Sequence, residues 1–249
     1  MPLLHCDWGL AGLHAGADTA DILIIVDVLS FSTAVDIACA RGAGVVPATS
    51  DGDAEVFEAA YPSALMASAT RDLERPSLSP SSLRTLSAGS TIILPSPNGA
   101  TLARQPFDGL LLVGCLRNAW AIGDAVREHR GNILVIAAGE RWPDGSLRVA
   151  LEDWLGAGAI ISHLGGSRTP EAQAAAESFQ TSELYLRDRI LATVSGQELV
   201  ARGFALDVEL AVDLDVSDVV PALADGVFRS LTPPGDPDAP PPARGLKPA

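Results

Sequence analysis

Residues 20–49, ADILIIVDVLSFSTAVDIACARGAGVVPAT, decide the fold of this chain. They begin with a continuous apolar run, which is typical of a strand buried on both faces of a sheet. Asp27 ends that run, and a segment rich in serine and threonine, beginning at Ser30, supplies N-cap candidates for a helix. A second short strand follows over residues 44–49. The stretch therefore predicts a β-α-β unit, which normally has parallel strands and a right-handed crossover.

The same layout of strand, polar turn and helix recurs farther along the chain. It predicts an α/β fold with a mixed or mostly parallel sheet flanked by helices. Three segments repeat the layout: STIILPSPNGATLARQ (90–105), GLLLVGCLRNAWAIGDAVREH (109–129) and NILVIAAGERW (132–142). We further expect a strand over 65–69, a long loop over 70–90, helices over 150–164 and 169–203, and a strand with an acidic turn over 203–223.

The length and composition suit a single α/β unit over residues 1–229, which could consist of two intertwined lobes. The chain has 249 residues, of which 47% are hydrophobic, so it can bury a large core. From Ser230 onward the sequence is rich in proline and cannot bury apolar surface. We therefore predict a disordered tail over 230–249.

Charge and composition exclude several classes of function. The formal net charge of -14 repels phosphate backbones, so we expect no nucleic-acid partner. No uncharged apolar run of about 18 residues is present, which excludes a membrane span, and the N-terminus does not resemble a signal peptide. We therefore expect a cytoplasmic protein. The three cysteines are too widely spaced for a disulfide framework or a zinc motif and are interpreted as buried apolar residues.

Carboxylates follow or precede several of the predicted elements. Asp27 follows the first strand, where it could hold a metal ion, act as a base or cap the next helix. Glu152 and Asp153 open a predicted helix. There they could complement the helix dipole, or they could serve a divalent cation or general acid–base chemistry.

Asparagine and glycine also stand at strand exits. Asn98 and Gly99 form a turn signal, but together with Ala100 and Thr101, which open a helix, they could also direct backbone N–H groups at an anion. Asn118 follows the next strand in the same way. The pair Gly139 and Glu140 follows the strand after that. In open α/β sheets ligands bind beyond the carboxyl ends of the strands, so these residues are candidates for one site.

The order of the motifs resembles the 2-phosphosulfolactate phosphatase family. The matching segments run in order over residues 22–222: IIVDVLSFSTAV, PNGAT, GCLRNAWAI, IAAGE, LEDWLGAGAII and GFALDVELAVDLDVSDVVP. The resemblance implies an α/β fold of the family's own type and a Mg²⁺-dependent phosphatase. Such an enzyme removes phosphate from 2-phosphosulfolactate, a small anionic phosphorylated hydroxy acid.

The residues and the resemblance together define a candidate site. The resemblance also matches Asp207 to an aspartate near the C-terminus, although an acidic turn is the favoured interpretation of that region. The catalytic and metal-binding candidates are Asp27, Glu152 and Asp153, and the substrate-binding candidates are Ser30, Asn98, Gly99, Ala100, Thr101, Asn118, Gly139 and Glu140.

The chain departs from the family pattern at two places. Ser30 stands where the pattern has an arginine, and serine cannot replace the charge of a guanidinium. In the altered central segment SATRDLERPSLSPSSL (68–83), only Ser79 and Pro80 clearly persist. Four arginines could compensate: Arg71, Arg75, Arg117 and Arg141.

Three hypotheses follow for the function. The leading hypothesis is a Mg²⁺-assisted phosphatase in which water attacks the phosphoryl group directly. The second is a divergent family member that binds a small anion or acts on another substrate. The third is a homo-oligomeric structural protein. Helix-rich, alanine-rich surfaces make a homodimer our expectation for the assembly.

Overall fold

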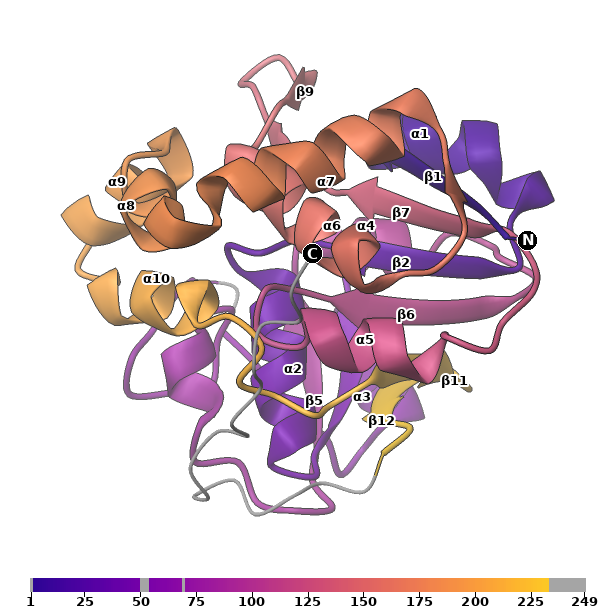
Figure 1. The fold of residues 1–249 in the computed structure, drawn as a ribbon. Helices are drawn as coiled ribbons and strands as arrows, with labels where there is room; N and C mark the ends of the chain where they lie inside the picture. The colour runs from indigo at the N-terminus through magenta and orange to yellow at the C-terminus, as the bar shows by residue number, and fades with distance from the viewer. Residues whose placement is uncertain (1, 50–53, 69, 233–249) are drawn as a thin grey trace.

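The computed structural model describes residues 2–49, 54–68 and 70–232. It is an α/β fold with a large, mostly parallel sheet flanked by helices, which confirms the predicted fold class (Figure 1). Within the described ranges, ten strands form one sheet. In spatial order they are β10 (Ser167–Arg168), β1 (Leu3–Trp8), β7 (Ile133–Ala137), β2 (Ile22–Val26), β6 (Leu110–Gly114), β11 (Pro221–Ala224), β12 (Val227–Ser230), β3 (Gly44–Ala48), β5 (Thr91–Pro95) and β4 (Leu65–Met66).

The helices differ in length and in the part of the sheet that they cover. Their bounds are α1 (Gly9–Gly16), α2 (Phe31–Ala40), α3 (Ala54–Ala60), α4 (Gly99–Ala103), α5 (Ala119–Ala125), α6 (Leu151–His163), α7 (Pro170–Ser182), α8 (Leu186–Leu191), α9 (Val194–Ala201) and α10 (Ala205–Val212), with 3-10 turns η1 (Ala17–Thr19), η2 (Pro80–Leu83) and η3 (Glu183–Tyr185). Helices α8 to α10 lie together beside one end of the sheet (Figure 1).

The central strand β2 explains why the apolar run is continuous. Alternate residues of a strand point to opposite faces, so a strand covered on both faces needs apolar side chains throughout. Ile22, Ile24 and Val26 pack in one core with helices α5, α6 and α7. Leu23 and Ile25 pack in a second core with α1, α2 and α4.

The sheet consists of two parallel blocks joined by an antiparallel hairpin. One block is β10-β1-β7-β2-β6 and the other is β3-β5-β4, and the β11–β12 hairpin lies between them. The hairpin pairs with β6 through Ala222 and Leu112 and with β3 through Phe228 and Val45, one residue pair at each junction.

This hairpin corrects the predicted parallel β-α-β unit. Strands β2 and β3 are not neighbours, and three antiparallel pairings separate them, so they run in opposite senses along the sheet. The prediction was wrong because the segment that separates the two strands comes from residues 221–230, far away in the sequence.

Two other segments differ from expectation. The strand expected within 203–223 is helix α10 over its first part, because the buried residues Val208, Ala211 and Val212 have helical spacing. The N-terminal residues, for which no strand was predicted, form β1, which pairs in parallel with β7. The long loop over 70–90 and the helix over 150–164 correspond to what the structure shows where it is described.

The described helices include none that is long and apolar enough to cross a membrane. The tail predicted from Ser230 falls largely outside the described residues, and Ser230 itself is the last residue of β12.

Candidate active site

Asp27 lies at the carboxyl end of β2, and its carboxylate is held in place by two backbone groups. Its Oδ2 accepts a hydrogen bond of 2.8 Å from the Gly99 N–H, and its Oδ1 accepts one of 3.2 Å from the Phe31 N–H. The Asp27 N–H in turn donates to the Ser32 hydroxyl. The carboxylate therefore links the start of α2 to the start of α4, so that the carboxyl ends of β2 and β5 meet despite their opposite senses.

Asp153 makes a similar link between β2 and β7. From the first turn of α6, its carboxylate accepts the N–H of Val28 at 2.7 Å and the N–H of Gly139 at 2.8 Å. Gly139 has a φ of 68°, and a Cβ there would lie 2.5 Å from Cδ1 of Leu147. Glycine is therefore required at this position by both its conformation and its surroundings.

Two glutamates complete the cluster. Glu152 is 2% exposed, and its Oε2 has no hydrogen-bond partner in the described part of the chain. Glu140 begins β8 (Glu140–Arg141), which pairs with β9 (Leu147–Arg148) in a two-stranded hairpin. The Asn98 amide donates to Oε2 of Glu140 at 2.8 Å. Acidic groups from separate stretches of chain thus converge, and Asn98 joins them.

Burial of Asp27, Asp153 and Glu140 favours the neutral forms of these three side chains. It raises the pKa of Asp27, and the charge of Glu152 adds to this effect, while the two backbone N–H groups and Arg71 oppose it. Burial also raises the pKa of Asp153, again with the charges of Asp27 and Glu152. Burial and the charge of Asp27 raise the pKa of Glu140 to about 7. A concentration of buried acids with raised pKa values is typical of sites that bind protons or cations.

The carboxylate oxygens of the cluster suit a hard cation, but they do not surround a metal ion completely. Among the described residues, no group of three or more His, Cys, Asp or Glu side chains is arranged to hold a metal ion. Mg²⁺ needs no such cage, because it usually keeps several waters and takes one or two carboxylates together with substrate phosphate. Oε2 of Glu152, which has no hydrogen-bond partner among the described residues, is the best candidate for such a carboxylate ligand.

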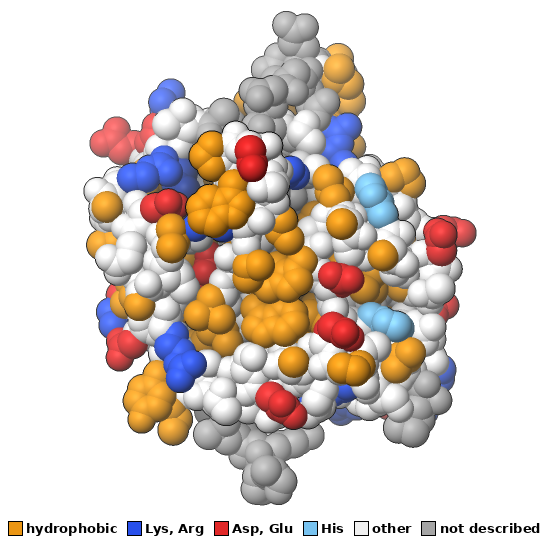
Figure 2. All heavy atoms as spheres, turned by 90° about the horizontal axis from the view of Figure 1, so that it is seen from above, with side chains coloured by type: hydrophobic (Ala, Val, Ile, Leu, Met, Phe, Trp, Pro, Cys, Tyr) orange, Lys and Arg blue, Asp and Glu red, His pale blue; other side chains and the backbone are white. Residues whose placement is uncertain are grey.

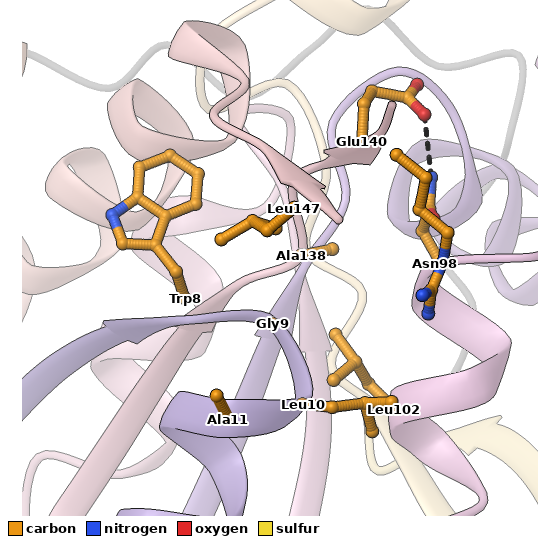
Figure 3. A pocket seen from close by; sticks show the side chains of 10 residues that line it. Trp8, Gly9, Leu10, Ala11, Asn98, Leu102, Ala138, Glu140 and Leu147 are labelled. Carbon is orange, nitrogen blue, oxygen red and sulfur yellow. Dashed lines mark hydrogen bonds between the residues drawn. The ribbon is translucent and has the colours of Figure 1, made fainter. Parts of the chain in front are cut away.

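A cavity of about 190 Å³ opens beside this cluster. Figure 3 shows Asn98 and Glu140 pointing toward each other at one rim, with Trp8 and Leu147 on another side. The indole of Trp8 stacks on that of Trp154 at 5.3 Å, which fixes this wall. The apolar lining includes Trp8, Leu10, Leu102, Ala138 and Leu147, and the polar lining consists of Asn98, Glu140 and Arg141.

The structure does not bring every predicted residue to the cluster. The Asn118 side chain is fully buried: its Oδ1 accepts the Cys115 N–H at 2.8 Å, and its Nδ2 donates to the carbonyls of Val113 and Val219. These hydrogen bonds join the backbone at the end of β6 to the backbone at Val219, so Asn118 has a structural role. Ala100 and Thr101 lie in α4, where the Thr101 hydroxyl donates to the Pro97 carbonyl.

Of the four arginines that could compensate for Ser30, Arg71 reaches it. Its Nη2 donates to the Ser30 hydroxyl at 2.5 Å, and its Nη1 lies 3.3 Å from Oδ2 of Asp207. Asp207 lies in α10, not in an acidic turn, and is fully buried. The sequence offers Arg71 as no more than one of four possibilities, because its contact with Ser30 depends on the path of the 70–79 segment.

The cysteine thiols are not available as nucleophiles. All three are buried and free, which confirms the interpretation of the sequence. Burial raises the pKa of Cys6 and of Cys115 to about 12, so both are protonated at neutral pH.

Comparisons with known proteins agree with the order of motifs. The family model for 2-phosphosulpholactate phosphatase matches residues 11–226. A probable 2-phosphosulfolactate phosphatase of Carboxydothermus hydrogenoformans is 31% identical over 207 residues, which cover 80% of this chain and 84% of the relative. The 2-phosphosulfolactate phosphatase of Methanothermobacter thermautotrophicus is 32% identical over 138 residues, 55% of this chain and 58% of the relative. A probable 2-phosphosulfolactate phosphatase of Gloeobacter violaceus is 29% identical over 214 residues, 82% and 88% of the two chains.

Proposed function

Because this chain belongs to the 2-phosphosulfolactate phosphatase family, we propose that it removes phosphate from a small phosphorylated hydroxy acid such as 2-phosphosulfolactate. The family match confirms the predicted family and favours a phosphoric monoester hydrolase over a structural protein. The observation that carries the proposal is the convergence of Asp27, Asn98, Glu140 and Asp153 at the carboxyl ends of β2, β5 and β7.

We propose Mg²⁺ as the cofactor and Asp27, Glu152 and Asp153 as the residues that would hold it. When bound, Mg²⁺ would polarise the phosphoryl group and offset its negative charge. The support is the hard oxygen chemistry of the three carboxylates and the unpartnered Oε2 of Glu152. The hydrogen bonds from Val28, Gly139 and Gly99 would keep these carboxylates in place before the substrate arrives.

Glu140 is our candidate for the group that accepts a proton from the attacking water. Its pKa of about 7, caused by burial and by Asp27, suits transfer of a proton near neutral pH. The Asn98 amide orients its carboxylate at the rim of the cavity. The oxygen of that water would then attack phosphorus and the ester P–O bond would break. The leaving oxygen would take up a proton from solvent to give the free hydroxy acid, and Glu140 would return its proton to solvent.

The test is release of phosphate from a panel of phosphorylated hydroxy acids, with purified protein in EDTA and after return of Mg²⁺. We expect release that EDTA abolishes and Mg²⁺ restores. Glu152→Gln should lower release by about 10- to 100-fold, since it removes the charge of a ligand to the metal. Release that EDTA does not change would refute the metal proposal. Binding of these compounds without any release would favour the alternative, a divergent member that binds small anions.

We also propose that the protein is a cytoplasmic homodimer. Figure 2 shows hydrophobic side chains gathered in the middle of one face, beside acidic ones. Trp142, Val149 and Leu151 are among the large apolar residues that the structure leaves exposed. Exposed apolar patches support association of copies. Analytical ultracentrifugation would test this, and a single species of about 26 kDa at all concentrations would contradict it.

A further inference from the structure

A largely but not fully buried arginine, Arg71, lies next to the carboxylate cluster. The side chain of Arg71 is 11% exposed. Its Nη1 donates to the Leu78 carbonyl at 3.2 Å and to Asp207 at 3.3 Å, and its Nη2 donates to the Ser30 hydroxyl. Its charge is close enough to Asp27 to favour the ionised form of that carboxyl.

The contacts of Arg71 leave part of its guanidinium unused. A guanidinium has five N–H donors. Three are used here, and within the described residues Nε and the second N–H of Nη2 have no hydrogen-bond partner. The ion-pair partner is also shared, because Oδ1 of Asp207 accepts the hydroxyl of Ser79 at 2.7 Å and the N–H of Ser81 at 3.1 Å.

Arg117 is the other largely buried arginine among the sequence candidates, and it forms an ion pair of a structural kind. Its Nε donates to Asp36 at 2.8 Å, and its Nη1 donates to the Leu210 carbonyl. Burial lowers the pKa of Arg117, but Asp36, together with Cys115 and Asp213, outweighs burial and keeps that pKa above its usual value. For Arg71, by contrast, burial prevails and lowers the pKa. The charge of Arg71 is thus less fully compensated than that of Arg117.

A second cation lies near Arg71. The guanidinium carbons of Arg71 and Arg202 lie over the same ring of Phe204, at 5.9 Å and 5.8 Å from its centroid. Two guanidinium groups in one place are unexpected in a chain with a formal net charge of -14. They create a local positive potential at the margin of an acidic site, and this potential favours the binding of an anion there.

We propose that Arg71, oriented by Ser30, binds the acid group of the substrate that is not hydrolysed, a carboxylate or a sulfonate. This inference rests on the proposed function and deepens it. The phosphoryl group would lie at the carboxylate cluster, and the planar guanidinium would offer its free N–H donors to two oxygens of the acid group. Arg71 is then a specificity-determining residue, and the loop over 70–79 delivers it.

The test compares two phosphate esters that differ in that acid group alone. In 2-phospholactate, the carbon that bears the ester oxygen also carries a methyl group and a carboxylate. In isopropyl phosphate, the same carbon carries two methyl groups. We expect Arg71→Gln to lower kcat/KM for 2-phospholactate about 100-fold, mainly through KM, because charged hydrogen bonds are lost. For isopropyl phosphate, which has no acid group for Arg71 to bind, we expect a loss at least about tenfold smaller, caused only by the loss of the charge that favours ionised Asp27. An equal loss for both esters, or no loss for either, would overturn the proposal.

Arg75→Gln is the matched control. Arg75 lies in the same loop, but its side chain is 75% exposed and pairs with Asp72. We expect it to leave both esters unchanged. If Arg71→Gln does not fold, Ser30→Ala serves instead, since it removes the contact that orients Nη2. It should raise KM for 2-phospholactate alone, and an equal effect on both esters would again count against the proposal.

Calorimetry with sulfolactate, which has no phosphate to lose, separates this proposal from the phosphatase proposal. If the wild-type protein releases no phosphate, the proposed function fails. Sulfolactate binding that Arg71→Gln weakens at least about tenfold would still support the acid-group subsite. If the wild-type protein releases phosphate but Arg71→Gln binds sulfolactate as tightly as the wild type does, the subsite fails alone.

Discussion

Gly99 lies between Asp27 and Phe31, and replacing it with alanine is the most direct test of how this site is built. An ideal Cβ on Gly99 would lie 2.3 Å from Cδ1 of Phe31 and 2.8 Å from Oδ2 of Asp27. Phe31 is fully buried, so its ring has little room to move away. The backbone of α4 must therefore shift, and this shift lengthens the hydrogen bond that the Gly99 N–H donates to Asp27.

The size of the effect follows from these contacts. Overpacking of a buried site costs about 1–3 kcal/mol, and a buried polar group that loses its partner costs a similar amount. We therefore expect Gly99→Ala to lower the free energy of unfolding by about 3 kcal/mol and Tm by roughly 6–12 °C for a protein of this size. Phosphate release should fall as well, because Asp27 loses one of the two backbone groups that position its carboxylate.

Urea unfolding and the phosphate-release assay measure both effects. Gly165→Ala is the control, because no atom lies within 4 Å of the Cβ that it would add, and Gly165 is not among the glycines with a positive φ. That variant should unfold within about 1 kcal/mol of the wild type. The reasoning is refuted if both variants unfold at the same urea concentration and release phosphate equally fast.

Two further predictions concern Glu140 and Asn118. In metal-free protein the pKa of Glu140 is about 7 when folded and near 4.5 when unfolded, so the stability that it contributes is fully present below pH 4.5 and is lost as the pH rises through 7. Glu140→Gln should reduce this loss in urea unfolding at pH 5 and pH 8 with EDTA, and an unchanged pH dependence would contradict the assignment. Asn118→Ala should lower the free energy of unfolding by about 2–4 kcal/mol, because backbone groups of Cys115, Val113 and Val219 lose a buried partner, and should leave KM unchanged. A raised KM with an unchanged free energy of unfolding would instead indicate that Asn118 binds substrate.

Local pattern explains which parts of the molecule can be predicted from sequence. The buried strands β2, β6 and β7 are recognisable because each is a short apolar run that ends in polar residues. Their parallel pairing then brings the residues that follow them to the same edge of the sheet. For this reason the sequence alone is enough to predict that Asp27 and Gly139 lie at the same edge of the sheet.

The features of the fold and the site that the sequence did not predict depend mainly on contacts between distant segments. No local signal indicates that β11 and β12 separate β2 from β3, since the pairing joins Val45 to Phe228. The contact of Arg71 with Ser30 likewise joins residues 41 positions apart through an irregular loop. The strand predicted in place of helix α10 was wrong because a short apolar run is ambiguous between the two periods.

The position of the β11–β12 hairpin in the chain bears on the order in which the molecule can assemble. Residues 221–230 close the gap between β6 and β3, yet they come after every other strand in the sequence. Until they are in place, β6 and β3 are both open edges, which are prone to pair with other chains. Contacts of such long range also slow folding. Nascent or truncated chains that lack this hairpin therefore expose two strand edges that the folded chain covers, and they should aggregate more readily than chains in which the hairpin is in place.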